Sequence, residues 1–146
     1  MKIAFDEHIP PPVQLAVLPL LDGARFKNVT VVAAKKYAEP PATSDVPWME
    51  KFKADGGGAI VSGDNAMRRK PHERQAITDL RMVLIFLPPS WNNAEFAEKS
   101  GYIMYWWPVI LELIHKSRPG QCWELPKGTK VNIKSVRDVT GAKGSK

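Results

Sequence analysis

The chain has 146 residues, of which 44% are hydrophobic, and its formal net charge is +6. This length suits one ordinary domain, and the apolar content excludes a disordered protein. The single cysteine, Cys122, excludes a disulfide framework or a cysteine-rich zinc site within one chain, and we interpret it as a small buried apolar residue. The positive charge would attract an anionic partner such as nucleic acid, although a basic but inert surface is the commoner explanation.

The ends of the chain and its apolar runs bear on where the protein works. The opening residues 1–5 lead straight into acidic residues, unlike a signal peptide. The longest apolar run, residues 103–114, is interrupted by a proline and a glutamate and is too short to span a membrane. We therefore expect a cytoplasmic protein that has no membrane partner. We expect residues 1–140 to form a single domain and residues 141–146 to form a disordered tail.

The first half of the chain alternates short strands with helices. Strands are predicted at residues 3–5, 29–32 and 59–62, which are apolar or β-branched runs. A first helix is predicted to begin at the prolines 10–12, and a second to begin at an N-cap, Ser44 or Asp45. Because Pro19 lies inside the first helical pattern, we expect the last turn of that helix to be bent or lost.

The second half continues this alternation. Its predicted elements are a helix over 72–80, a strand over 82–87, a helical stretch from about 92 to 115, and strands near 122–125 and over 131–136. In the long helical stretch we expect Phe96 on the apolar side, and Gly101 and Pro108 favour a kink or two helices. Strands that alternate with helices predict an α/β fold, with a mostly parallel sheet and helices on both faces.

Four acidic residues fall where this topology would gather them. Asp6 ends the first strand and Asp64 ends the third, while Asp45 and Glu73 begin the helices after the second and third strands. These positions share the rim of a parallel sheet at which ligands bind. Crowded carboxylates raise one another's pKa, and a bound divalent cation removes that penalty. Carboxylates favour Mg²⁺ or Mn²⁺ over Zn²⁺, and such a site can hydrolyse a phosphodiester.

Each of these acids also has a purely structural explanation. Asp45 and Glu73 could simply stabilise the starts of their helices. Asp64, which follows a glycine, could be a turn residue, and Asp6 could be a solvated loop acid.

Basic and aromatic residues accompany the acids. The basic residues are Arg68, Arg69, Lys70 and Arg74. They could hold the phosphates of a nucleic acid strand that flank the cleaved bond, or they could form a solvated loop. Trp48 and Trp91 are predicted near the same edge, and for both we favour packing in the core over stacking on bases.

Three motifs, in this order, resemble those of short PIN-like proteins. Residues 5–10, Phe-Asp-Glu-His-Ile-Pro, resemble the family's opening strand followed by Asp-Glu-Asn-Leu-Pro. Residues 44–48 resemble its second acidic helix start, and residues 60–65 resemble its strand ending in Thr/Ser-x-Asp. The resemblance covers most of residues 1–90. It implies a three-layer α/β/α PIN-like fold with a mostly parallel central sheet, and a ribonuclease that depends on Mg²⁺ or Mn²⁺.

The same resemblance implies roles and partners. Asp6, Asp45 and Asp64 would be the metal-binding acids. Asn65 stands where many relatives have a further Asp, so Glu73 is our candidate for the fourth catalytic acid. Many relatives are toxins of bacterial toxin–antitoxin pairs, which implies an RNA substrate and an antitoxin partner. The region from about Asn92 onward lies outside the matched part and could form a homodimer or receive an antitoxin.

Three functions remain open at this stage. The first is a metal-dependent endoribonuclease, the toxin of a toxin–antitoxin system. The second is a non-catalytic PIN-like module that binds nucleic acid or a protein partner. The third, a phosphoacceptor receiver domain, needs a lysine at the end of a later strand, where this chain has Pro88 and Pro89 instead.

Overall fold

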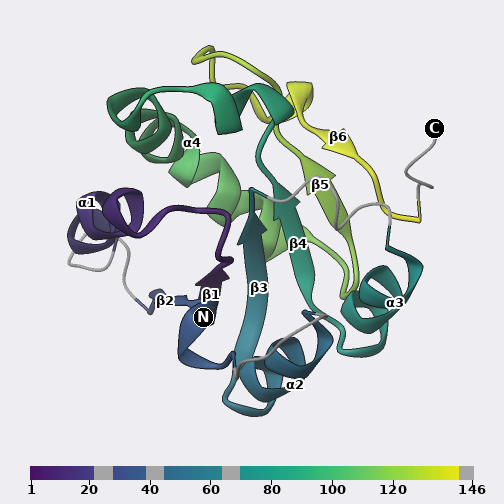
Figure 1. The fold of residues 1–146 in the computed structure, drawn as a ribbon. Helices are drawn as coiled ribbons and strands as arrows, with labels where there is room; N and C mark the ends of the chain where they lie inside the picture. Colours follow the sequence, from purple (N-terminus) through teal and green to yellow (C-terminus); the bar gives the residue numbers. More distant parts are fainter. Residues whose placement is uncertain (22–27, 39–44, 64–69, 142–146) are drawn as a thin grey trace.

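A mostly parallel β-sheet lies between two layers of helices (Figure 1). The computed structural model describes residues 1–21, 28–38, 45–63 and 70–141. Its strands are β1 (Lys2–Phe5), β2 (Thr30–Ala33), β3 (Gly57–Ser62), β4 (Val83–Phe86), β5 (Cys122–Glu124) and β6 (Arg137–Asp138). They lie in the order β2-β1-β3-β4-β5-β6, and only β6 among these described strands runs antiparallel to its neighbour. This confirms the predicted α/β fold with a mostly parallel central sheet.

The helices cover both faces of the sheet. They are α1 (Pro11–Leu21), α2 (Val46–Ala54), α3 (Pro71–Asp79) and α4 (Phe96–Lys116), with short 3₁₀ helices η1 (Ala34–Lys36), η3 (Pro89–Asn93) and η4 (Ile133–Ser135). Helices α1 and α4 pack together on one face, and α2 and α3 pack together on the other (Figure 1). The layers are therefore those of a three-layer α/β/α fold.

Each face of the sheet has its own hydrophobic core, because successive strand residues point to opposite faces. In β4, Val83 and Ile85 join the core under α1 and α4, whereas Leu84 and Phe86 join the core under α2 and α3. The first core is strongly aromatic, and the ring of Trp107 meets that of Phe5 edge to face at 5.9 Å between centroids. Burial of β3 and β4 on both faces explains their unbroken apolar sequences.

Two expectations about prolines in helices are answered in part by the helix bounds. Helix α1 continues through Pro19 to Leu21, so its last turn is present. Helix α4 is one element of 21 residues that contains Pro108, and not two helices. Pro108 is exposed, while buried side chains lie on both sides of it in the sequence, from Ile103 to Ile114. We infer that packing of this apolar side outweighs the lost backbone hydrogen bond.

The start of α4 also differs from the prediction. The helical stretch was expected from about Asn92, but residues up to Asn93 belong to η3, and Glu95 is the N-cap of α4. Phe96, which was placed on the apolar side, is 52% exposed. It occupies the first position of α4, where the side chain lies beyond the edge of the sheet's core.

The strand predicted over 131–136 is wrong. Ile133–Ser135 forms η4, and the following strand, β6, contains only Arg137 and Asp138. The side chain of Asn132 accepts a hydrogen bond of 2.9 Å from the backbone N–H of Lys134, and the hydroxyl of Ser135 donates one of 2.6 Å to the Asn132 carbonyl. These local bonds favour a turn over the strand that the β-branched residues of this segment suggest.

Several smaller expectations can also be compared with the structure. Trp48, Trp91 and Cys122 are all buried, as predicted. Burial raises the pKa of the Cys122 thiol to about 11, which fits an unreactive core residue. Within the part of the chain that the structure describes, no helix is long and apolar enough to cross a membrane. Residues 142–146 of the predicted tail lie outside the described residues.

Candidate active site

Asp6 lies where β1 and β3 end, and its carboxylate is buried with only 3% of the residue exposed. The register of the two parallel strands pairs Phe5 with Val61, which brings the next residues, Asp6 and Ser62, side by side. The Asp6 backbone N–H donates to the Val61 carbonyl at 3.1 Å, so the position of the residue is set by the sheet itself. A carboxylate is thus held at the rim predicted from the sequence.

Three protein donors contact the Asp6 carboxylate. Its Oδ1 accepts hydrogen bonds from the backbone N–H groups of His8 at 3.1 Å and Gly63 at 3.2 Å. Its Oδ2 accepts a hydrogen bond from the Ser62 hydroxyl. The His8 imidazole Nδ1 lies 3.9 Å from Oδ2, and the His8 side chain is 46% exposed. The sequence analysis missed Ser62 and Gly63, although the expected parallel pairing of the two strands could have indicated them.

Burial and hydrogen bonding act on this carboxyl group in opposite directions. Burial raises the pKa of Asp6 from 3.8 to about 6, while the donors from Ser62, Gly63 and His8 lower it. The pKa still lies below neutral pH, so most of the Asp6 population carries its negative charge at pH 7. A buried carboxylate that stays ionised is suited to attract a cation or to accept a proton.

Asp45 and Glu73 are brought together on the face of the sheet covered by α2 and α3. Asp45 is the N-cap of α2, but its carboxylate accepts a hydrogen bond of 3.0 Å from the indole Nε1 of Trp48 and makes no side-chain cap bond. The Asp45 backbone N–H donates instead to Glu73 Oε2 at 2.8 Å. Glu73 is fully buried in the first turn of α3. Its carboxylate therefore links the starts of the two helices.

Two of the predicted basic residues lie within the described part of the chain, close to this link. Lys70 is exposed, with its Nζ 3.9 Å from Glu73 Oε1, and His72 Nε2 lies 4.0 Å from Oε2 of the same carboxylate. Arg74 is half-buried, and its guanidinium Nη2 donates to the Val139 carbonyl at 2.8 Å. Asp64, Arg68 and Arg69 lie outside the described residues.

Comparison with protein families identifies the N-terminal part of the chain. A family model described as PIN like domain matches residues 1–89. The chain belongs to this PIN-like domain family. Domains of this family are generally nucleases and typically use divalent metal ions. No curated protein and no solved structure matches the chain. The family match contains the strands β1 to β4 and the residues Asp6, Asp45 and Glu73.

The metal typical of PIN-like domains can be tested against the residues at this rim. Two hydrogen bonds occupy the lone pairs of Asp6 Oδ1. Among the described residues, Oδ2 accepts one hydrogen bond, from Ser62, and has His8 Nδ1 3.9 Å away, so one acceptor position is left on this oxygen. Asp6 thus fits a single ligand position. Among residues 1–21, 28–38, 45–63 and 70–141, no three His, Cys, Asp or Glu side chains gather closely enough to hold one ion.

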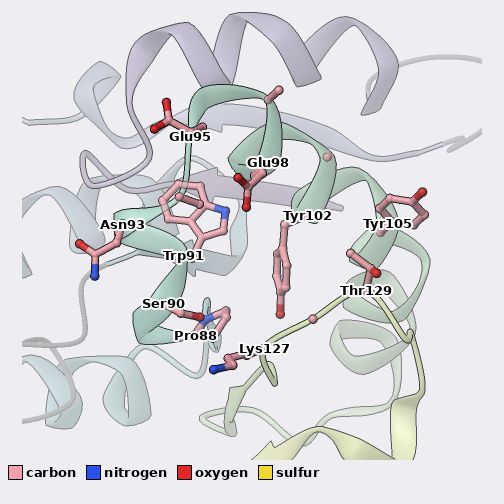
Figure 2. Close-up of a pocket in the computed structure, with 14 residues that line it drawn as sticks. Pro88, Ser90, Trp91, Asn93, Glu95, Glu98, Tyr102, Tyr105, Lys127 and Thr129 are labelled. Atoms are coloured by element: carbon pink, nitrogen blue, oxygen red, sulfur yellow. The ribbon is translucent and has the colours of Figure 1, made fainter.

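A cavity of about 740 Å³ beside η3 was not predicted from the sequence (Figure 2). Residues of η3, the first turns of α4 and the turn 127–129 line it. The Asn92 side chain donates from Nδ2 to the Gly63 carbonyl at 3.0 Å, so η3 is attached to the residue that also donates to Asp6. The aromatic residues after position 90 are the sequence signal that could have pointed to this cavity.

Proposed function

We propose that the protein is an endoribonuclease that hydrolyses RNA phosphodiester bonds with Mg²⁺ or Mn²⁺ as cofactor. One observation carries the proposal: in a chain of the PIN-like family, the carboxylate of Asp6 is buried at the carboxyl ends of β1 and β3, where Ser62, Gly63 and His8 donate hydrogen bonds to it. An acid that is held in this state, at the rim where parallel sheets bind ligands, suits the hydrolysis of an anionic substrate.

In this proposal Asp6, Asp45 and Asp64 are the metal-binding acids. A bound divalent cation would polarise the scissile phosphate and lower the pKa of a bound water. Ser62 and Gly63 hold the Asp6 carboxylate so that one oxygen keeps its free acceptor position. Glu73 orients the start of α2 through the Asp45 backbone N–H, and we place it as the fourth acid of the site.

The basic residues would hold the RNA on either side of the cleaved bond. Arg68, Arg69 and Lys70 are placed as contacts to its phosphates. Arg74 was predicted with them, but its hydrogen bond to Val139 supports a structural contribution as well.

The test is cleavage of single-stranded RNA by the purified chain in Mg²⁺ or Mn²⁺. We expect cleavage to require the added cation and to be abolished in Asp64→Asn. The matched control is Asp79→Asn, which changes an exposed acid at the end of α3 and should keep full activity. Undiminished cleavage in EDTA, or equal loss of activity in both variants, would contradict the proposal.

A non-catalytic PIN-like binding module is the second candidate. It is favoured because two of the predicted acids make hydrogen bonds within the protein. The Trp48 indole donates to the Asp45 carboxylate, and the Asp45 backbone N–H donates to the Glu73 carboxylate. Calorimetry with Mn²⁺ separates the two functions. The nuclease proposal expects binding by the native chain that is lost in Asp6→Asn, whereas the binding module expects the same negligible heat from both.

We further propose that the nuclease is the toxin of a toxin–antitoxin pair, with a cognate antitoxin as its protein partner. The resemblance of residues 5–10 to the opening of short PIN-like proteins, many of whose relatives are such toxins, supports this. Induced expression of the native chain in a bacterial host should stop growth, and expression of Asp64→Asn should not. Normal growth with active nuclease present would show that the protein is not a toxin in that host.

A further inference from the structure

The cavity beside η3 has rigid walls built from aromatic side chains. The Tyr102 hydroxyl donates to the Pro126 carbonyl, and the indole Nε1 of Trp106 donates to the Gly128 carbonyl at 2.9 Å. The rings of Tyr102 and Trp106 stack with 5.9 Å between their centroids. On the opposite side, Trp91 Nε1 donates to the Lys99 carbonyl at 3.1 Å. These bonds hold the turn 127–129 and η3 around the cavity, so it exists before any ligand binds.

The cavity is connected to the candidate active site through Trp91 and Gly63. Trp91 lines the cavity and packs against Gly63, and the Gly63 N–H donates to Asp6. A Cβ at position 63 would lie 3.3 Å from the Trp91 ring and 3.2 Å from the His8 carbonyl, which is tighter than an ordinary contact, so glycine favours this close packing. A chain whose phosphate lies at Asp6 could therefore place a neighbouring group in the cavity.

The polar side chains of the cavity indicate which group it accepts. Glu95 and Glu98, from the start of α4, line it together with Lys127 (Figure 2). The two exposed carboxylates would repel a phosphate and accept hydrogen bonds from a neutral donor. Figure 2 shows the Glu98 carboxylate close to the Trp91 and Tyr102 rings in this view, with Tyr105 farther along α4. Tyr105 is 62% exposed, and its ring face is accessible for stacking.

These features together suit a planar aromatic ring with hydrogen-bond donors on one edge. Single-stranded RNA presents such rings, because its unstacked bases can pack on aromatic side chains and bond through their Watson–Crick edges. Among the four bases, guanine has two adjacent donors on that edge, N1–H and the N2 amino group, which match the two oxygens of one carboxylate. We propose that the cavity binds a guanine base next to the cleaved bond, with Glu98 accepting from N1–H and N2–H and Tyr105 stacking on the ring.

This inference rests on the proposed action on RNA, but it can be tested by binding alone. The probes are fluorescently labelled hexauridine strands with one internal guanosine, inosine or adenosine, and anisotropy gives each Kd in EDTA. We expect the guanosine strand to bind about tenfold more tightly than the adenosine strand, as a bidentate contact to a base provides. Inosine, which lacks the N2 amino group, should bind with intermediate affinity.

Two variants locate the effect in the cavity. Glu98→Gln should remove the preference for guanosine, and Tyr105→Ala should weaken binding of all three strands. Glu112→Gln is the matched control, because Glu112 is an exposed acid of the same helix that does not line the cavity. Removal of one negative charge should raise the affinity for any RNA, and Glu112→Gln measures this effect. The preference is the Kd of the adenosine strand divided by the Kd of the guanosine strand, and the general rise in affinity cancels in this ratio.

The outcomes separate the two proposals. A guanosine preference that disappears in Glu98→Gln but persists in Glu112→Gln supports the base site, even if the chain never cleaves RNA. RNA cleavage without any base preference keeps the nuclease and overturns the base site. Equal effects of the two glutamine variants on the preference also overturn it.

Discussion

Asp6→Asn isolates the energetic effect of a buried charge at the candidate active site. The native carboxylate accepts from the N–H groups of His8 and Gly63 through one oxygen and from the Ser62 hydroxyl through the other. An asparagine amide has nearly the same shape. Its oxygen can accept from the same two N–H groups, and its NH₂ group can donate to the Ser62 oxygen. The variant therefore removes the ionisable group while it keeps the packing.

The sign and size of the effect follow from the pKa of Asp6. Burial raises this pKa from 3.8 in the unfolded chain to about 6 in the folded chain, so the folded state holds a proton in a range where the unfolded state has lost it. Binding of this proton stabilises the folded state over the unfolded state. The stabilisation is fully present below pH 3.8 and is lost as the pH rises through about 6. The shift corresponds to about 3 kcal/mol. The free energy of unfolding of Asp6→Asn, relative to that of the native chain, should therefore rise by about 3 kcal/mol between pH 3.5 and 7.5.

Urea unfolding at a series of pH values, with EDTA present, measures this difference. The five tryptophans supply the fluorescence signal. The matched control is Asp55→Asn, whose stability relative to the native chain should fall, and not rise, as the pH increases. Hydrogen bonds from Tyr37 and Lys2 lower the pKa of Asp55, so the native chain gains stability there as the pH rises. Parallel stability curves for native and Asp6→Asn proteins would refute the dominant effect of burial on Asp6.

Three further predictions concern the stability and reactivity of the scaffold. Gly56→Ala should destabilise the chain by about 1–2 kcal/mol in urea unfolding, because Gly56 has a φ of +94°, whereas Gly101→Ala, in open space within α4, should stabilise it by about 0.5–1 kcal/mol. Loss of stability in both would contradict this reasoning. Gly63→Ala should cost about 1–3 kcal/mol, because a Cβ would press on Trp91, and unchanged stability would show that this contact relaxes freely. Cys122 should react with a thiol reagent at pH 8 only after unfolding, since burial raises its pKa to about 11, and fast reaction of the folded chain would contradict it.

The parts of the fold that the sequence predicted well are those with strong periodic signals. The apolar run 82–87 indicated a strand buried on both faces, and β4 is that strand. The Asp45-Val46-Pro47 pattern indicated a helix start, and α2 begins at Val46. Alternation of strands and helices is enough to predict a parallel sheet. When short loops connect these elements and all strands join one sheet, few topologies are possible. The position of Asp6 at the sheet's rim followed from this topology alone.

Predictions failed where a local rule competes with packing or with hydrogen bonds of the turn. Pro108 predicted a kink or a division into two helices, and the second alternative is wrong, because buried side chains around it, such as Trp107 and Ile110, keep one helix against the sheet. Valine and isoleucine in 131–136 predicted a strand, but the Asn132 side chain holds a turn there. Intrinsic propensities amount to about 1 kcal/mol or less for ordinary residues and about 3 kcal/mol for a proline inside a helix, so burial of several side chains or a capping bond can outweigh them.

The candidate site shows the same division between topology and side-chain contact. The predicted topology placed Asp45 and Glu73 near one rim of the sheet. It could not predict that the Asp45 backbone N–H donates to Glu73, because that bond depends on how α2 and α3 pack. The cavity beside η3 was beyond sequence reasoning for a related reason. Its walls join Trp91, Tyr102 and the turn after β5, which hydrogen bonds between distant segments bring together, such as those from Tyr102 to Pro126 and from Trp91 to Lys99. Sequence periodicity describes single elements, whereas this cavity arises from the contacts between three of them. We therefore expect a base preference in RNA binding to distinguish this chain from a PIN-like domain that has the acidic rim alone.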